Sequence, residues 1–127
     1  MLTKNFEFSF EKLVVWQQSI DFVKKIYGYV EIFPKSELYG LTSQIKRAST
    51  SIPANIAEGS TRKSFKDQAR FTEIAFGSLI ETLNHLVIAE KLNYISKEIL
   101  NELRSDIESL SRQINALKNS QNERVAK

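Results

Sequence analysis

The stretch RASTSIPANIAEGSTRKS, residues 47–64, contains a proline at position 53 inside a sequence that otherwise follows a helical pattern. Apolar residues recur every three or four positions on both sides of the proline, which is the spacing that keeps one face of a helix apolar. These positions are Leu38, Leu41, Ile45, Ala48, Ile52 and Ile56. We therefore predict a helix that follows Ser36 as its N-cap, passes through Pro53 and ends at Gly59.

Pro53 should disturb the helix that contains it. It has no N–H to donate to the carbonyl of Ser49, and its ring crowds that carbonyl. We expect a kink at this point, with the hydroxyls of Ser49, Thr50 and Ser51 close to the freed backbone groups. The kink could wrap the helix around the core, or it could shape a protomer contact or a ligand groove. The two interpretations are compatible.

The same spacing predicts three further helices. The first, from Phe10 to Phe33, has an apolar face formed by Leu13, Trp16, Ile20, Val23, Tyr27 and Val30. The third, which ends near Leu92, has a face formed by Ala69, Thr72, Phe76, Leu79, Leu83 and Leu86. The fourth has a regular face formed by Leu100, Leu103, Ile107, Leu110, Ile114 and Leu117.

Polar residues mark the ends of the third and fourth helices. Ser64 with Asp67 three residues later resembles a capping box that contains the shorter acid. Asn93 can take the left-handed conformation that ends a helix, and Ser96 can cap the next one. The connections between the four helices are therefore short.

Four helices joined by short connections indicate an all-α fold, an antiparallel up-down four-helix bundle with a proline kink in its second helix. We expect an extended N-terminal lead-in over residues 1–9, the bundle over residues 10–118, and a polar, frayed tail over residues 119–127. No apolar run reaches the roughly 18 residues of a membrane span, and the N-terminus has no signal-peptide pattern. We therefore expect a cytoplasmic protein without membrane association.

The residues that carry catalysis and bind metals are scarce. The chain has no cysteine and one histidine, His85, which forms an i, i+4 pair with Glu81. A di-iron bundle needs two Glu-x-x-His motifs, and a serine hydrolase needs a nucleophile elbow; both are absent. Glycine-rich phosphate loops are absent too. We therefore expect no enzyme, no cofactor and no metal, and we interpret the His85 pair as structural.

Positive charge is concentrated in residues 34–70, whose net charge is +4 within a chain total of +3. Arg62, Lys66 and Arg70 are spaced to share one face where the third helix begins, and antiparallel packing would bring Arg47 within about 20 Å. The candidate nucleic-acid-binding residues are Lys46, Arg47, Arg62, Lys63, Lys66 and Arg70. The alternative is a solvated helical face that binds nothing.

Aromatic residues within this basic stretch are limited to Phe65 and Phe71, which we interpret as packing residues. The sequence has no RNP, KH or zinc-finger motif. Contact with phosphates and RNA shape is therefore favoured over recognition of bases.

Several other residues have candidate structural or interface roles. They are Pro53, Asn55, Glu58, Gly59 and Gly77. Glu58 could accept from backbone N–H groups at the start of the third helix, and Asn55 could bond across an interface or to the carbonyls freed by Pro53. Gly77 costs up to about 1 kcal/mol in mid-helix, so another helix should approach closely there, either inside the bundle or across a protomer boundary.

The run GLTSQIKRASTSIPANIAEGSTRKS followed by FTEIAFGSLIE resembles the signature of the four-helix-bundle family of 23S rRNA intervening-sequence proteins, also called S23 ribosomal proteins. The resemblance extends from about Phe10 to the end of the third helix. It implies a bacterial, cytosolic bundle that assembles as a homopentamer. In shape, such bundles are similar to the accessory variability proteins of diversity-generating retroelements, which present basic surfaces to nucleic acid and a reverse transcriptase.

Residues and resemblance together predict a non-enzymatic oligomeric bundle that offers a basic surface to RNA, in particular rRNA or a nucleoprotein. Its expected partners are further copies of itself, RNA, and a reverse transcriptase or a ribosomal component. The alternative is a structural assembly or protein adaptor without nucleic-acid affinity.

Overall fold

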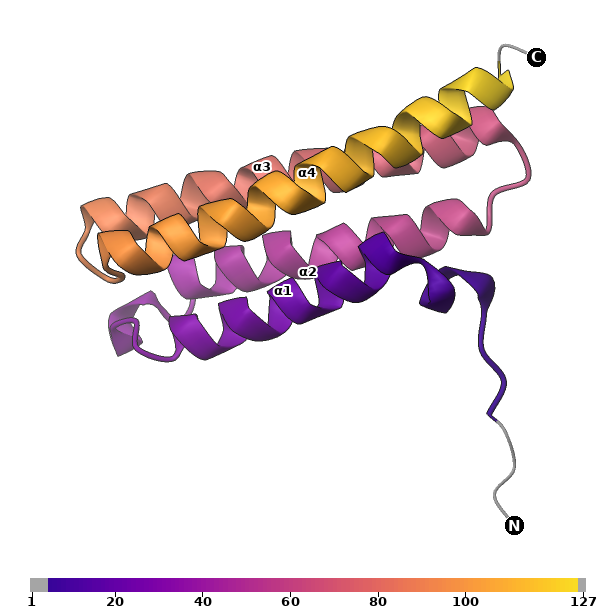
Figure 1. Ribbon diagram of the computed structural model, residues 1–127. Coiled ribbons are helices and arrows are strands. Elements are labelled where there is room, and N and C mark those ends of the chain that lie inside the picture. Colours follow the sequence, from indigo (N-terminus) through magenta and orange to yellow (C-terminus); the bar gives the residue numbers. More distant parts are fainter. Residues whose placement is uncertain (1–4, 126–127) are drawn as a thin grey trace.

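A computed structural model describes residues 5–125 and shows four α-helices in a bundle (Figure 1). Short 3-10 helices, η1 (Ser9–Lys12) and η2 (Lys35–Glu37), precede α1 (Val14–Val30) and α2 (Leu41–Ser60). The other two helices are α3 (Phe65–Lys91) and α4 (Lys97–Val125). Consecutive helices run in opposite directions, so the described part of the chain forms the all-α bundle that the apolar spacing predicts.

The core lies between all four helices, and α2 and α3 form its most extensive contact. The side chains of Ile26, Ile45, Ile52, Leu79 and Leu103 are completely buried. Burial of each such side chain contributes roughly 2 kcal/mol to folding. Within residues 5–125, no helix is both long enough and apolar enough to span a membrane.

The buried face of α1 differs from the predicted one. The core contacts come from Val15, Ser19, Phe22, Ile26 and Val30, whereas the predicted Trp16, Ile20 and Val23 are only partly buried and Tyr27 is exposed. The buried face thus lies about one residue round the helix, because two neighbouring apolar stripes exist and the prediction chose the outer one. Ser19 is tolerated in the core because its hydroxyl donates to the Trp16 carbonyl at 2.7 Å.

The buried face of α3 is mostly the predicted one, since Ala69, Thr72, Leu79 and Leu86 are buried. Thr72, Ala75, Leu79 and Thr82 lie at its buried centre, whereas the predicted Phe76 and Leu83 pack at its edges. The Thr82 hydroxyl donates to the Ser78 carbonyl at 2.8 Å, and the Thr72 hydroxyl is paired as described below. Small and hydroxyl-bearing residues therefore line the central seam, where helices approach closely.

The predicted N-cap of α2 at Ser36 is wrong. Ser36 lies inside η2, and α2 begins at Leu41 after Gly40. The carboxylate of Glu37 accepts from the Leu41 N–H at 3.1 Å and from the Tyr94 hydroxyl at 2.9 Å. Glu37 thus satisfies a backbone donor at the helix start and connects it to the segment between α3 and α4. The first helix also starts later than predicted, because Leu13 is extended and separates η1 from α1.

The predicted ends of the last two helices agree better with the structure. The Ser64 hydroxyl accepts from the Asp67 N–H at 3.1 Å, and the Ser96 hydroxyl accepts from the Ile99 N–H at 3.1 Å. Asn93 has a φ of 63°, the left-handed conformation that its side chain tolerates.

The predicted tail is helical over most of its length, because α4 continues to Val125. Gln121 is only 7% exposed, and its side-chain oxygen accepts from the Thr72 hydroxyl at 2.7 Å. This buried pair holds the last turns of α4 against the start of α3. The polar sequence misled the prediction because the buried side chain of this segment, Gln121, is itself polar and has a polar partner. Residues 1–4 of the predicted lead-in and residues 126–127 of the tail lie outside the described residues.

Helix α2 passes through the buried Pro53 without interruption. The hydroxyls of Ser49 and Thr50 donate to the Lys46 carbonyl at 3.1 and 2.9 Å, one turn before the carbonyl that the proline leaves free. The Asn55 amide donates to the Ser51 carbonyl and hydroxyl at 2.8 and 2.9 Å. Such bonds from side chains to the preceding turn often bend a helix. The kink itself stays a prediction.

Candidate nucleic-acid interface

The turn between α2 and α3 positions some of the predicted nucleic-acid-binding residues. Arg62 and Lys63 lie in this turn, and Lys66 lies in the first turn of α3. Gly59 makes the turn possible, because a Cβ at this position would lie 2.9 Å from the Cβ of Phe71. The absence of a side chain therefore allows α3 to pass close to the end of α2.

Arg62 does not share a face with Lys66 and Arg70, so the predicted three-residue stripe is wrong. Its guanidinium lies over the Phe71 ring, 4.5 Å from the centroid, and 3.9 Å from the Glu58 carboxylate. The reason is local. Ser64 is extended, so Arg62 precedes α3 and the i, i+4 relation does not apply to it.

Glu58 has a different neighbour from the one predicted. Its exposed carboxylate approaches Arg62 and forms none of the bonds seen at the start of α3, where Ser64 caps the helix instead. An exposed ion pair of this kind contributes little to stability.

A groove between the start of α3 and the end of α4 contains the predicted Lys66 and Arg70. It has a volume of about 570 Å³ and is lined by Lys66, Asp67, Ala69, Arg70, Glu73, Lys118 and Asn122. We call this surface the α3–α4 groove. The ion pairs found among residues 5–125 include none of its three cations. Three cations face two carboxylates, so the groove carries a net positive charge.

The cations of the groove lie close enough to repel one another. Lys66 and Arg70 are one helical turn apart, and like charges at this spacing destabilise a helix by roughly 0.2–0.5 kcal/mol. Lys118 adds a third positive charge from the neighbouring helix. An anion in the groove would relieve this repulsion and accept hydrogen bonds from all three side chains.

Lys118 is the functional candidate that sequence reasoning missed. It lies in the last third of α4, beside the segment predicted to be a frayed tail. The antiparallel α3–α4 pair places the end of α4 beside the start of α3, as the Thr72–Gln121 bond shows. That pairing could have identified Lys118 if α4 had been extended beyond residue 118.

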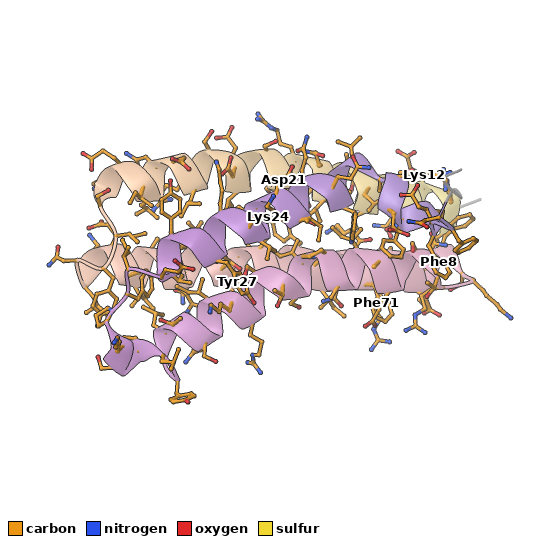
Figure 2. All side chains as sticks on the ribbon, turned by 90° about the horizontal axis from the view of Figure 1, so that it is seen from below. Phe8, Lys12, Asp21, Lys24, Tyr27 and Phe71 are labelled. Atoms are coloured by element: carbon orange, nitrogen blue, oxygen red, sulfur yellow. The ribbon has the colours of Figure 1, made fainter. Side chains whose placement is uncertain are left out.

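Lys46 and Arg47 lie far from the groove. The Lys46 ammonium sits over the Tyr27 ring, 4.8 Å from the centroid, on the side of α2 that faces α1. Arg47 lines a notch between α2 and α3 together with Ser51, Ser78 and Glu81. Figure 2 shows Tyr27 and Phe71 at separate places along the bundle. Thirteen helical positions separate Arg47 from Ser60 at the end of α2, which corresponds to about 20 Å.

The predicted packing role fits Phe71, whereas Phe65 is exposed. Phe71 is partly buried beneath Arg62, and Phe65 is 39% exposed beneath the Arg124 guanidinium, 5.2 Å from the ring centroid. Neither residue lines the α3–α4 groove, so the groove offers charge without aromatic rings.

Gly77 and His85 lie outside the groove. Gly77 is exposed, and a Cβ there would meet no atom within 4 Å, so the predicted close approach inside the bundle is wrong. His85 lies 3.6 Å from Glu81, and its buried Nδ1 has no hydrogen-bond partner. Residues 5–125 contain no cluster of three side chains suited to hold a metal ion.

Comparison with known proteins identifies relatives of this chain. The model of the family described as 23S rRNA-intervening sequence protein matches residues 11–116. A crystal structure from Bacteroides thetaiotaomicron, described as a protein with unknown function from the S23 ribosomal protein family, is similar with a TM-score of 0.75 and 25% identity. The similarity covers 83% of this chain and 98% of that one. No curated protein matches. The chain belongs to the family of 23S rRNA-intervening sequence proteins.

Proposed function

We propose that the protein is a non-enzymatic RNA-binding bundle that holds structured RNA, in particular rRNA, through phosphate contacts in the α3–α4 groove. The observation that carries the proposal is the convergence of Lys66, Arg70 and Lys118 from two helices without an ion-pair partner among residues 5–125. Lys63, exposed in the preceding turn, extends the positive surface around the end of the bundle.

The chemistry of the groove favours phosphate over bases. Lysine and arginine donate to phosphate oxygens, whereas readout of a base edge needs a precisely placed donor and acceptor set. Ala69, with its short side chain, lets an RNA backbone approach the groove. No aromatic ring lines the groove for an RNA base to stack on. Such a surface recognises the shape and charge of a folded RNA.

Charge reversal tests the proposal directly. Lys66→Glu combined with Arg70→Glu should reduce affinity for a structured rRNA hairpin by at least about a hundredfold, because two phosphate contacts become repulsive. The matched control is Lys24→Glu with Arg104→Glu, which changes the net charge equally at exposed positions outside the groove. Equal losses in both variants would show a diffuse attraction and would contradict a site in the groove.

We propose further that the protein self-associates, as a homopentamer, through the outer face of α3. Ile74, Ile80 and Ile88 are 45%, 46% and 39% exposed on this face, and the exposed Gly77 lies between them. A helix that is apolar outside as well as inside gains by packing against a second partner. The missing side chain at Gly77 would let a neighbouring helix approach closely.

Light scattering after size-exclusion chromatography tests the assembly. The natural chain should have the mass of five copies, and Ile80→Lys should reduce this mass while helicity stays the same. Ile32→Lys is the matched control, because Ile32 is 64% exposed in the turn that follows α1, outside α3, and should be neutral. A monomeric natural chain would contradict the proposal.

The exposed face of α3 also favours the rival function, a protein adaptor without nucleic-acid affinity. A reverse transcriptase or a ribosomal protein would then be the partner. The hairpin titration distinguishes the two functions, because an adaptor has no affinity for naked RNA even at low salt.

A further inference from the structure

Four aromatic rings form a ladder at the N-terminal end of the described chain. The Phe6 and Phe8 rings meet edge to face with centroids 4.9 Å apart, and the Phe8 and Phe10 rings are nearly parallel at 6.3 Å. Phe10 then contacts Trp16 edge to face at 5.2 Å. Trp16 packs against the core, so one end of the ladder is anchored in the bundle.

The other end of the ladder reaches into solvent. Phe6 is 79% exposed and Phe8 is 59% exposed. The position of Phe8 is fixed by two bonds to Glu11, since its N–H donates to the carboxylate at 2.8 Å and its carbonyl accepts from the Glu11 N–H at 3.1 Å. Because the two rings contact each other from positions two apart, Glu7 lies on the other side of the segment. The bundle presents these rings without using them in its core.

A hollow adjoins the base of the ladder. Its volume is about 350 Å³, and its lining combines the apolar Leu13, Ile56 and Leu117 with Ser9, Ser60, Gln68, Ser120, Gln121 and Arg124. Ser9 directly follows Phe8, so the hollow and the rings are neighbours. The hollow and the α3–α4 groove share the last turns of α4, because Ser120 and Arg124 line the hollow whereas Lys118 and Asn122 line the groove.

The aromatic rings, the hollow and the α3–α4 groove lie at one end of the molecule. In Figure 1 the N-terminal segment leaves the bundle at the end where α2 turns into α3 and where α4 finishes. Figure 2 shows Phe8 and Lys12 at the same end as Phe71. Exposed rings, hydrogen-bonding groups and cations therefore surround a single end of the bundle.

We propose that Phe6 and Phe8 stack on unpaired bases of an RNA whose adjoining duplex lies in the α3–α4 groove. This inference rests on the RNA-binding function proposed above and adds single-stranded nucleotides to its ligand. Exposed aromatic rings beside cations are the combination that binds single-stranded nucleic acid, because every base has a face on which a ring can stack. The net positive charge of the α3–α4 groove at this end of the bundle, together with Arg124 in the hollow, suits an anionic ligand.

The test compares two RNA hairpins with the same stem, one blunt and one with a short single-stranded extension. The natural protein should bind the extended hairpin roughly tenfold more tightly. Phe6→Leu with Phe8→Leu keeps the apolar volume but removes the rings, and it should reduce the affinity for the extended hairpin to that for the blunt one. Tyr39→Leu is the matched control, because Tyr39 is an aromatic residue 93% exposed at the opposite end.

Photo-crosslinking locates the contact independently of affinity. An extension that contains 4-thiouridine should crosslink to the tryptic peptide of residues 5–12, which includes both rings. Equal affinity of the natural protein for the two hairpins would overturn the proposal, as would crosslinks confined to other peptides. If the Leu variant lost assembly mass instead of its preference for the extension, the rings would contact another copy, which also overturns it.

The experiments distinguish a failure of the groove proposal from a failure of the stacking proposal. If the natural protein does not bind the blunt hairpin, the groove function is wrong. A single-stranded oligonucleotide alone then tests the ladder, because stacking on Phe6 and Phe8 needs no duplex, and absence of a crosslink to residues 5–12 would overturn the inference. If the blunt hairpin binds but the extension adds nothing, only the stacking proposal is wrong.

Discussion

At the scale of single residues, two glycines in helices have opposite surroundings. Gly59 is buried, and an added Cβ would lie 2.9 Å from Phe71 and 3.4 Å from the Gln68 carbonyl. Gly77 is exposed, and an added Cβ would meet nothing within 4 Å. The sequence marks both residues as unusual for a helix, yet only the packing shows that Gly59 is required by a neighbour in the same chain.

This contrast predicts the effects of two alanine substitutions on stability. Gly59→Ala should lower the free energy of unfolding by about 1–2 kcal/mol, because the strain of overpacking exceeds the gain in helix propensity. Gly77→Ala should raise it by about 0.5–1 kcal/mol in the monomer, because alanine favours the helix and has space. Urea unfolding of both variants checks the prediction, and a loss of stability in dilute Gly77→Ala would contradict it.

At the scale of the elements, polar contacts connect helix ends that are distant in sequence. Glu37, before α2, accepts from the Tyr94 hydroxyl in the segment between α3 and α4. Lys25 of α1 pairs with Glu102 and Asp106 of α4 at 3.2 and 2.8 Å. The Leu41 N–H and the Tyr94 hydroxyl lower the pKa of Glu37, and the Tyr29 hydroxyl and Lys25 lower the pKa of Glu102.

These lowered pKa values predict an acid-sensitive fold. A carboxyl group whose pKa is lower in the folded state adds stability above its unfolded value of 4.5 and loses that contribution as pH falls through the folded value. The free energy of unfolding should therefore decline below about pH 4.5, and Glu37→Gln should make the decline shallower. Urea titrations between pH 6 and pH 3 measure both slopes, and identical slopes for the variant and the natural chain would count against this assignment.

The sequence predicts elements better than it predicts faces. The four helices, the Ser64 and Ser96 caps and the left-handed Asn93 follow from local spacing and side-chain chemistry, which are properties of short segments. The buried face of α1 does not follow, because two adjacent apolar stripes satisfy the same spacing. The predicted basic stripe of Arg62, Lys66 and Arg70 was only partly right for a related reason. Lys66 and Arg70 follow helical spacing, whereas the position of Arg62 depends on where the helix starts.

At the scale of the whole molecule, the outer face of α3 is divided between two kinds of surface. Its beginning carries Lys66 and Arg70 beside Lys118, and its middle carries exposed isoleucines around Gly77. Ile74 is one helical turn from Arg70, so an assembly through the middle of α3 would place the grooves of neighbouring copies near its contacts. If these grooves stay accessible in one ring, they would bind one long RNA with greater avidity than a single groove.

The most direct test of the central claim is the salt dependence of hairpin binding, because the claim assigns phosphate contacts to cations from two helices. A log–log plot of affinity against salt should have a slope of roughly −3 for the natural protein, from about 0.9 per neutralised phosphate at three cations. Lys118→Gln should reduce the magnitude of this slope by about one and leave helicity unchanged. An unchanged slope in Lys118→Gln, or no binding of the natural protein at low salt, would contradict the α3–α4 groove as the RNA site.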